Sequence, residues 1–212
     1  KMFGEGKWRA GTIISNSIGQ GEVLATPLQI ANAMAIIANK GYYITPKICR
    51  YLVKDKKYRA PKRQKNVIPI DSVYFRYVTD GLEKVVLAGT AKVARIPDIS
   101  FCGKTGTAQN PHGKDHAVFL AFAPRENPQI AIACIVENAG FGGTWSAPIV
   151  TLMIEKYLRH KITRTDLEKR TLERSLLDRY AKYSGKKAVD SLLLKKPKEI
   201  DTTQVSKKKP NL

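Results

Sequence analysis

The sequence predicts an α+β fold in which helices flank an antiparallel sheet, followed by a charged C-terminal tail. Three strand-like segments, at 99–109, 116–123 and 129–137, follow one another with only short turns between them. Apolar residues at helical spacing occur both before and after this region, and lysine becomes frequent beyond residue 160. Short turns between consecutive strands favour an antiparallel meander, on which the helices would form a layer.

The first predicted helix begins at Pro27. Thr26 can cap it, Pro27 suits its first turn, and Gln29 completes a capping box. The helix is apolar nearly all round, so we expect it to be buried and to end at the Asn-Lys-Gly of 39–41. The preceding segment 17–22 contains two glycines and is expected to be a loop.

A second helix is expected between Asp71, which can cap it, and Gly89, which ends it. Its apolar residues fall on one stripe: Val73, Tyr77, Val78, Leu82, Val85 and Val86. Between the two helices, 42–53 predicts one or two short strands broken at Pro46, and 54–65 predicts a basic connection.

A third helix is expected at about 146–160, directly after the three strands. Thr165 to Glu168 has the pattern of another capping box, which predicts a further helix to about Lys182. From Ser184 on, lysine and proline dominate, and this composition is typical of a disordered tail. We therefore expect two parts, a folded one at 1–160 and a basic extension at 161–212 that is partly helical and then disordered.

The charge of the chain is strongly positive. Its 212 residues include 37 Lys and Arg against 18 Asp and Glu, which gives a formal net charge of +19. Such a balance favours polyanions, so a basic nucleic-acid-binding module, or a tail that docks on a membrane surface or a partner protein, stays open as an alternative. The basic residues do not cluster on one predicted element, however, and no RNA-recognition signature is present.

The sequence contains no predicted membrane span or signal peptide. The longest apolar runs, 117–124 and 129–136, fall far short of the roughly 20 residues that a bilayer span needs. The chain begins with Lys1 rather than Met, so we expect a piece of a longer protein. If half of a domain is missing, we expect an exposed apolar face.

Cysteines and histidines do not predict a metal site, and we expect no cofactor. Cys49, Cys102 and Cys134 lie at no metal-ligand spacing, and the last two are expected to be small buried apolar residues. His112 and His116 flank a turn, which does not hold positions i and i+4 on one face, and no third ligand is evident. All three histidines are expected at the surface.

The most informative segment is 103–110, Gly-Lys-Thr-Gly-Thr-Ala-Gln-Asn. On a strand, Thr105 and Thr107 share one face, and Lys104 and Gly106 share the other. Two hydroxyls on one face can bind one carboxylate, and the glycine lets another element approach the backbone. Lys104 is long enough to reach around the strand into an adjoining cleft, where its charge would favour an anionic substrate and lower the pKa of a neighbouring hydroxyl or amine. If the strand borders an acyl-transfer site, a backbone N–H near Thr107 could serve as an oxyanion donor.

The same residues have two other interpretations. A Lys-Thr-Gly match arises easily by chance, so the segment could be only an exposed strand end. Gly103-Lys104-Thr105 also matches the end of a phosphate-binding loop, but that motif needs a glycine where this chain has Asp98 and a helix where a strand and a turn are predicted. We therefore set the phosphate-loop interpretation aside.

Lys-Thr-Gly on a strand is one of three motifs of the serine acyltransferases that react with penicillin. The other two, Ser-x-x-Lys and Ser-x-Asn, have no credible copy in this chain. Literal Ser-x-x-Lys matches at 184–187 and 206–209 lie in the lysine-rich tail, on the wrong side of the Lys-Thr-Gly motif. Without an activated nucleophile and its base no acyl-enzyme forms, so we expect the chain to be inactive alone.

Several motifs occur in a fixed order, and together they resemble the C-terminal half of the transpeptidase domain of class B penicillin-binding proteins, most closely the elongation-type penicillin-binding protein 2. The resemblance covers roughly 1–160. The motifs that carry it are Ser17-Ile18-Gly19-Gln20-Gly21, Ala25-Thr26-Pro27-Leu28-Gln29, Ala38-Asn39-Lys40-Gly41, Gly89-Thr90-Ala91, Gly103-Lys104-Thr105-Gly106-Thr107-Ala108-Gln109 and Trp145-Ser146-Ala147-Pro148.

The resemblance implies an incomplete penicillin-binding transpeptidase/β-lactamase-like fold and a D,D-transpeptidase that cross-links peptidoglycan. In such an enzyme a serine attacks the D-Ala-D-Ala bond of a stem peptide, an amine resolves the acyl-enzyme, and β-lactams trap the serine. By this resemblance Lys104 lines the cleft, Thr105 and Thr107 bind the carboxylate of the substrate or β-lactam, and Gly106 gives clearance. The backbone N–H of Thr107 would be half of the oxyanion hole.

The resemblance also implies where the parent protein works and with what. Its partners would be stem peptides, β-lactams and other cell-wall elongation proteins, with no nucleic acid. It would lie on the periplasmic face of the bacterial inner membrane, held by an N-terminal anchor that precedes this chain.

Overall fold

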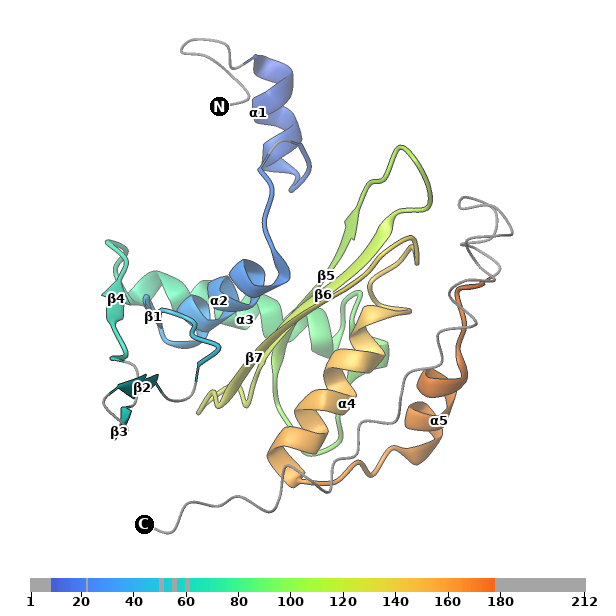
Figure 1. The fold of residues 1–212 in the computed structure, drawn as a ribbon. Coiled ribbons are helices and arrows are strands. Elements are labelled where there is room, and N and C mark those ends of the chain that lie inside the picture. Colours follow the sequence, from blue (N-terminus) through green and yellow to red (C-terminus); the bar gives the residue numbers. More distant parts are fainter. Residues whose placement is uncertain (1–8, 22, 50–51, 55–56, 60–61, 178–212) are drawn as a thin grey trace. The chain divides into compact units, whose positions relative to one another are not determined.

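The computed structural model describes residues 9–177 except 22, 50–51, 55–56 and 60–61 (Figure 1). The chain divides into two compact units, Lys1–Arg174 and Ser175–Leu212. The elements below belong to the first unit, which extends past residue 160; the division expected there stays a prediction. The tail from Ser184, expected to be disordered, lies outside the described residues.

The centre of the first unit is a three-stranded antiparallel sheet. Its strands are β5 (Cys102–Ala108), β6 (His116–Ala123) and β7 (Ile130–Val136), in the order β5-β6-β7. The predicted meander is therefore confirmed. In this sheet β5 and β7 are the edge strands, and β6 is hydrogen-bonded on both sides.

One face of the sheet is covered by α4 (Ser146–Arg159), which contacts β6 and β7 (Figure 1). The predicted third helix is thus confirmed. Because side chains alternate along β6, every second residue of that strand points toward α4. The core on this face contains Phe119, Ala121 and Ala123 from β6 and Ala147, Val150 and Ile154 from α4, packed with Val86, Ala91, Ala94, Ile96 and Phe101.

The other face of the sheet is covered by α2 (Pro27–Ala38), which contacts β6 and β7. The capping box at its start is confirmed, since the Thr26 side chain accepts from the Gln29 N–H and the Gln29 side chain accepts from the Thr26 N–H. Met34 packs against Cys102 and Phe122. The expectation that α2 is buried all round was wrong: only Met34 is fully buried, because in the described structure a single side of the helix contacts the sheet.

The helix α3 (Val73–Leu87) lies beside β5, and the Cys102 thiol on that strand donates to the Thr79 carbonyl at 3.5 Å. The predicted second helix is confirmed. Its N-cap is Ser72, which makes no side-chain capping bond, whereas the Asp71 carboxylate accepts from the Val73 N–H at 3.0 Å. Asp71 thus supplies the capping bond from one position further out.

Short elements complete the first unit. The strand β1 (Tyr42–Ile44) pairs with β4 (Lys65–Val67), and β2 (Leu52–Lys54) pairs with β3 (Lys57–Arg59). The expectation that 54–65 only connects was wrong, because three-residue strands are too short for an alternating pattern to reveal them. A single 3₁₀ turn, η1 (Lys92–Ala94), follows α3.

The helix α5 (Thr165–Glu173) follows α4, and two expectations about it were wrong. Its N-cap is Arg164, so Thr165 lies inside the helix and makes no capping bond. The helix ends at Glu173 rather than near Lys182; residues 178–182 lie outside the described ones. The start is set by tertiary contacts, because the carboxylate of Glu155 binds Thr163 and Arg164 just before the helix.

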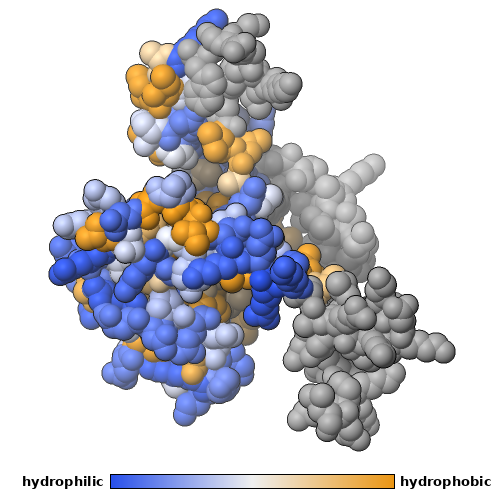
Figure 2. Space-filling view, turned by 90° about the vertical axis from the view of Figure 1, so that its left-hand side faces the viewer, coloured by the Kyte–Doolittle hydropathy of each residue, from blue (hydrophilic) through white to orange (hydrophobic). Residues whose placement is uncertain are grey.

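The segment 10–28 carries several exposed apolar residues, in agreement with the expected exposed apolar face. It includes α1 (Ala10–Ser17), which the sequence analysis did not predict. Figure 2 shows apolar side chains gathered in patches within a mainly hydrophilic face. The large apolar residues exposed in this segment are Ile13, Ile14, Ile18, Val23, Leu24 and Leu28. Among the described residues, no helix combines the length and the apolar character that crossing a bilayer requires.

Candidate active site

The candidate residues lie on β5, whose outer edge is not paired with another strand in the part of the chain that the structure describes. Thr105 pairs in register with Phe119, and Lys104 pairs with Leu120. Phe119 belongs to the core under α4, whereas Leu120 packs with Met34 on the α2 side. Directly opposed residues share a face of the sheet, so Thr105 and Thr107 face the α4 side and Lys104 and Gly106 the α2 side.

Thr105 and Thr107 are both half-buried, so neither is sealed in the interior. The Thr105 hydroxyl lies 2.7 Å from the hydroxyl of Thr90, a residue exposed on the loop after α3. Either oxygen of this pair can be the donor. A solvent-accessible pair of hydroxyls can turn a hydrogen outward to a carboxylate, so Thr90 joins Thr105 as a candidate ligand-binding group.

The backbone of Thr107 is directed to the open edge of β5. Its carbonyl accepts a hydrogen bond from the Gln20 side-chain amide at 2.8 Å rather than from β6. In an antiparallel strand the N–H and C=O of one residue point to the same side. The Thr107 N–H therefore also points to the open edge, as an oxyanion donor must if a substrate approaches along that edge.

Lys104 is exposed, and its ammonium nitrogen donates to the Thr105 carbonyl at 2.8 Å. Thr105 and Thr107 are two positions apart, so their carbonyls point to the same side of β5, and the Thr105 carbonyl also lies on the open edge. The side chain of Lys104 thus starts on the α2 face and brings its positive charge to the edge of the strand. A cation at this position favours an anionic ligand.

Gln20 is a further candidate site residue, and the sequence analysis did not predict it. Its amide donates to the Thr107 carbonyl, and its side-chain oxygen accepts from the Gln109 N–H at 3.3 Å. Gly19 (φ 76°) and Gly21 (φ 99°) flank it in backbone conformations that favour glycine, and this bend presents the side chain to β5. The Gly-Gln-Gly motif was the available signal, although its partner lies 87 positions away.

Two glycines after β7 allow the loop 140–145 to lie directly on β5, which carries the candidate residues and is called the site strand below. A Cβ atom on Gly142 would lie 2.0 Å from the Val118 carbonyl oxygen and 2.7 Å from that of Gly106. A Cβ atom on Gly143 would lie 3.2 Å from the Thr90 carbonyl oxygen and 3.7 Å from the Thr105 methyl group. The loop therefore packs on the site strand and reaches Thr105.

A cavity of about 870 Å³ adjoins the same strand on the α2 side. Its lining combines apolar side chains with polar groups near the open edge, among them Gln20, Leu24, Ile30, Thr107, Gln109 and His116. An apolar pocket with a few convergent polar groups is the usual form of a small-molecule site.

Histidines and cysteines supply no metal centre: in the described part of the chain, no three metal-ligating side chains come together. His112 and His160 are exposed as expected, but His116 is half-buried, and its Nδ1 accepts from the Asn138 N–H at 3.0 Å. Its place at the start of β6, beside β7, accounts for that difference. Cys102 is buried, and burial raises the pKa of its thiol to about 12.

Cys134 is half-buried rather than buried, because it lies on the edge strand β7. Ser146 is fully buried and donates to the Ala117 carbonyl at 2.7 Å, so it serves packing and is no nucleophile. The Ser-x-x-Lys matches at 184–187 and 206–209 lie outside the described residues.

The fold and the open-edged site strand agree with one protein family. The family model for the penicillin binding protein transpeptidase domain matches residues 3–155, and the chain belongs to this family. Among curated proteins, the chain is similar to peptidoglycan D,D-transpeptidase MrdA of Acinetobacter baumannii, with 38% identity over 156 residues that are 65% of this chain and 23% of that protein. It is also similar to MrdA of Escherichia coli K12, with 32% identity over 174 residues that are 72% of this chain and 26% of that protein.

Solved structures give the same result and confirm the expected fold class. Pseudomonas aeruginosa PBP2 in complex with WCK 5153 has 34% identity and a TM-score of 0.61, over 74% of this chain and 35% of that one. The imipenem acyl-enzyme complex of penicillin-binding protein A from M. tuberculosis has 32% identity and a TM-score of 0.59, over 68% of this chain and 33% of that one. The chain spans about a quarter of the length of the curated relatives that it matches. These similarities do not support the alternative of a nucleic-acid-binding module.

Proposed function

We propose that this chain is part of a peptidoglycan D,D-transpeptidase of the elongation type and forms one wall of its active site. The family and the curated relatives, which are named peptidoglycan D,D-transpeptidases, support this function. The attacking serine and its base would come from sequence outside this chain, so the chain alone would be inactive.

The open edge of β5 is the single observation that carries this proposal. An amide group, that of Gln20, already bonds there to the Thr107 carbonyl and the Gln109 N–H. A stem peptide is a chain of amides, and an extended peptide can add to an exposed sheet edge through the same backbone groups. The edge is therefore suited to align the D-Ala-D-Ala end of a stem peptide.

Each site residue has a proposed role. Thr105 and Thr107 bind the terminal carboxylate of the substrate, or the carboxylate that β-lactams carry in its place, and Lys104 supplies positive charge beside them. Gly106 gives clearance for the approaching ligand. When the serine adds to the scissile carbonyl, negative charge develops on its oxygen, and the Thr107 N–H donates to that oxygen as half of the oxyanion hole.

Neighbouring structures suggest the ligands and partners. Solved relatives include imipenem, ceftriaxone and penicillin G acyl-enzyme complexes of penicillin-binding protein A and a complex between PBP2 and MreC from Helicobacter pylori. By this similarity the parent protein binds β-lactams and assembles with other elongation proteins. It would work on the periplasmic face of the inner membrane, held by an anchor N-terminal to this chain.

Covalent labelling with a fluorescent penicillin tests the proposal. We expect the parent protein to be labelled and this 212-residue chain to remain unlabelled. Lys104→Ala in the parent should slow labelling by roughly tenfold or more, because a charge beside the ligand carboxylate is lost. Lys114→Ala, which removes an exposed lysine in the turn before β6, is the matched control and should label normally. Labelling of the isolated chain, or equal rates for the two variants, would contradict the proposal.

A further inference from the structure

The segment 160–174 lies beyond the family match, which ends at residue 155, and both of its ends are tied to the rest of the first unit. Helix α5, which makes up most of the segment, contacts α4. Figure 1 shows α5 running beside α4. The segment thus leads from the C-terminal end of α4 back toward the loop 140–145, which precedes α4. We refer to residues 160–174 as the strap.

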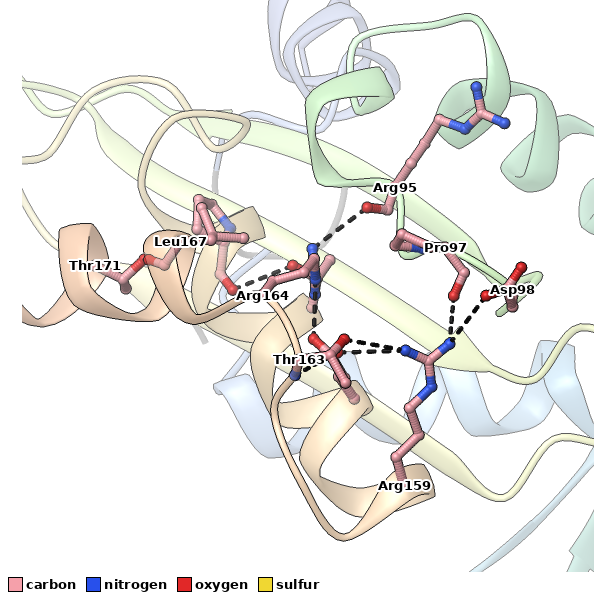
Figure 3. Close-up of polar contacts among 11 residues, drawn as sticks. Arg95, Pro97, Asp98, Arg159, Thr163, Arg164, Leu167 and Thr171 are labelled. Carbon is pink, nitrogen blue, oxygen red and sulfur yellow. Dashed lines mark hydrogen bonds and ion pairs between the residues drawn. The ribbon is translucent and has the colours of Figure 1, made fainter.

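The first end of the strap is held by Glu155, whose side chain is fully buried on α4. The carboxylate accepts from the Thr163 N–H at 2.8 Å and from Arg164 Nε at 2.9 Å, and it also bonds the Thr163 hydroxyl. Figure 3 shows Arg164 extending on to the Arg95 carbonyl and Arg159 reaching Pro97 and Asp98. Charge-assisted bonds of this kind fix the start of the strap on α4 and on the loop 95–98.

The second end of the strap is held by Arg174, one residue beyond α5. Its guanidinium carbon lies 3.9 Å from the centre of the Trp145 ring, and its Nη1 donates to the Thr144 carbonyl at 2.6 Å. A guanidinium can stack on an aromatic ring and donate in its own plane at the same time, and lysine does this poorly.

Thr144 and Trp145 belong to the loop that packs on the site strand. The N–H groups of both residues donate to the Phe141 carbonyl, so this part of the loop is a tight turn. Within it, the backbone of Gly143 lies close to Thr90 and Thr105, since a Cβ atom on Gly143 would be 3.2 Å from the Thr90 carbonyl oxygen and 3.7 Å from the Thr105 methyl group. Contacts that hold Thr144 and Trp145 in place therefore also hold the Gly143 backbone close to the side chain of Thr105.

We propose that Arg174 is a positioning residue for ligand binding at β5: it holds the loop 140–145 on the strand and so limits Thr105 to the orientation seen here. The inference rests on the proposed function, in which Thr105 binds the carboxylate of the ligand. Arg174 itself touches no ligand. Its contribution is to reduce the conformational freedom that Thr105 would lose on binding.

The test uses the parent protein, a fluorescent penicillin and three variants: Arg174→Ala, Arg174→Lys and Arg170→Ala. Arg170 is exposed on α5, and among the described residues it donates only to the Asp166 carbonyl of its own helix. Arg170→Ala therefore makes the same charge change as Arg174→Ala but leaves the loop contacts in place. Labelling rates are measured against penicillin concentration, which separates the apparent dissociation constant from the limiting acylation rate.

We expect Arg174→Ala to weaken the apparent binding roughly three- to tenfold at an unchanged limiting rate, as suits the loss of an exposed cation–π contact and one charged hydrogen bond. Arg174→Lys should recover part of the loss, and Arg170→Ala should behave as the unsubstituted protein. A merely structural role would instead lower the labelled end-point, which counts folded molecules, and leave the dissociation constant unchanged.

Fluorescence of Trp145 supplies an independent readout of the clamp. In the 212-residue chain Trp8→Phe leaves Trp145 as its single tryptophan, and Arg174→Ala in that background should increase quenching by acrylamide. Unchanged quenching overturns the inference, because the contact is then absent in solution. Increased quenching with unchanged penicillin binding overturns it as well, because the loop then does not act on Thr105. If the unsubstituted parent is not labelled at all, the proposed function fails together with the inference, whereas quenching still reports on the contact.

Discussion

Replacing Glu155 by glutamine should destabilise the first unit strongly. The side chain of Glu155 is fully buried, and those of Arg164 and Arg159 are only 15% and 24% exposed. Glutamine keeps the shape but removes the charge, and its NH2 group would face a donor in either orientation, Arg164 Nε or the Thr163 N–H. Removing one partner of a buried ion pair costs about 3–5 kcal/mol. Because water reaches both arginines in part, we expect the lower end, about 3 kcal/mol, or roughly a hundredfold in the folding equilibrium.

The stabilisation by Glu155 should depend on pH in a definite direction. Burial raises the pKa of Glu155, but the hydrogen bonds from Thr163 and Arg164 and the charge of Arg164 outweigh it, so the pKa lies below its usual value. A lowered folded-state pKa means that the carboxylate stabilises the protein above its unfolded pKa, about 4.3. This stabilisation disappears as the pH falls through the lower folded-state value.

Urea denaturation of the 212-residue chain and of Glu155→Gln measures the effect at pH 7 and at steps below pH 5. The exposed Glu173→Gln on α5 is the control and should stay within about 0.5 kcal/mol of the unsubstituted chain. We expect the free energies of unfolding of the unsubstituted chain and Glu155→Gln to differ strongly at pH 7 and to approach each other as the pH falls. Equal stability at pH 7, or a difference that persists unchanged in acid, would refute the reasoning that the charge of Glu155 holds this cluster.

Two further pairs of residues give predictions. Gly142→Ala should destabilise the chain by about 1–3 kcal/mol or more, because its Cβ would lie 2.0 Å from the Val118 carbonyl oxygen, as thermal melting would measure. Gly81→Ala has open space around its Cβ within α3 and should instead stabilise by about 0.5–1 kcal/mol; a loss at Gly81 or none at Gly142 would contradict the packing described here. Iodoacetamide at pH 8 should modify exposed Cys49 well before buried Cys102, whose thiol pKa is raised to about 12, and mass spectrometry that found Cys102 modified first would disprove its burial.

Local patterns in the sequence predict a large part of this fold. The turns at 110–115 and 124–128 separate strands whose alternation also fixed the faces of Thr105 and Lys104. The helices at 27–38, 73–87 and 146–159 followed from capping and apolar spacing. The Lys-Thr-Gly-Thr segment led to the correct family because several motifs agreed in their order.

Contacts between distant segments cannot be predicted from such local patterns. The residues around Gln20 do not predict that its amide reaches a strand 87 positions away. The residues around Thr90 likewise do not predict that its hydroxyl contacts Thr105. The burial of α2 was overestimated because apolar composition does not tell which side of a helix has a partner. The start of α5 was misplaced because the tertiary contacts of Glu155, not local capping, set it.

The amide of Gln20 and the ammonium of Lys104 have a consequence for the solubility of the chain. An unpaired strand offers its backbone groups to any other chain, and open edges are a common start of aggregation. Here the Thr107 carbonyl and the Gln109 N–H are taken up by Gln20, and the Thr105 carbonyl is taken up by Lys104. A second copy of the sheet would have to displace both side chains and desolvate a charge before it could add to β5. A stem peptide would displace the same side chains, but its carboxylate pairs with the Lys104 ammonium, whereas a second copy of β5 brings a like charge to that place. The edge therefore favours an anionic ligand over a second copy of the chain.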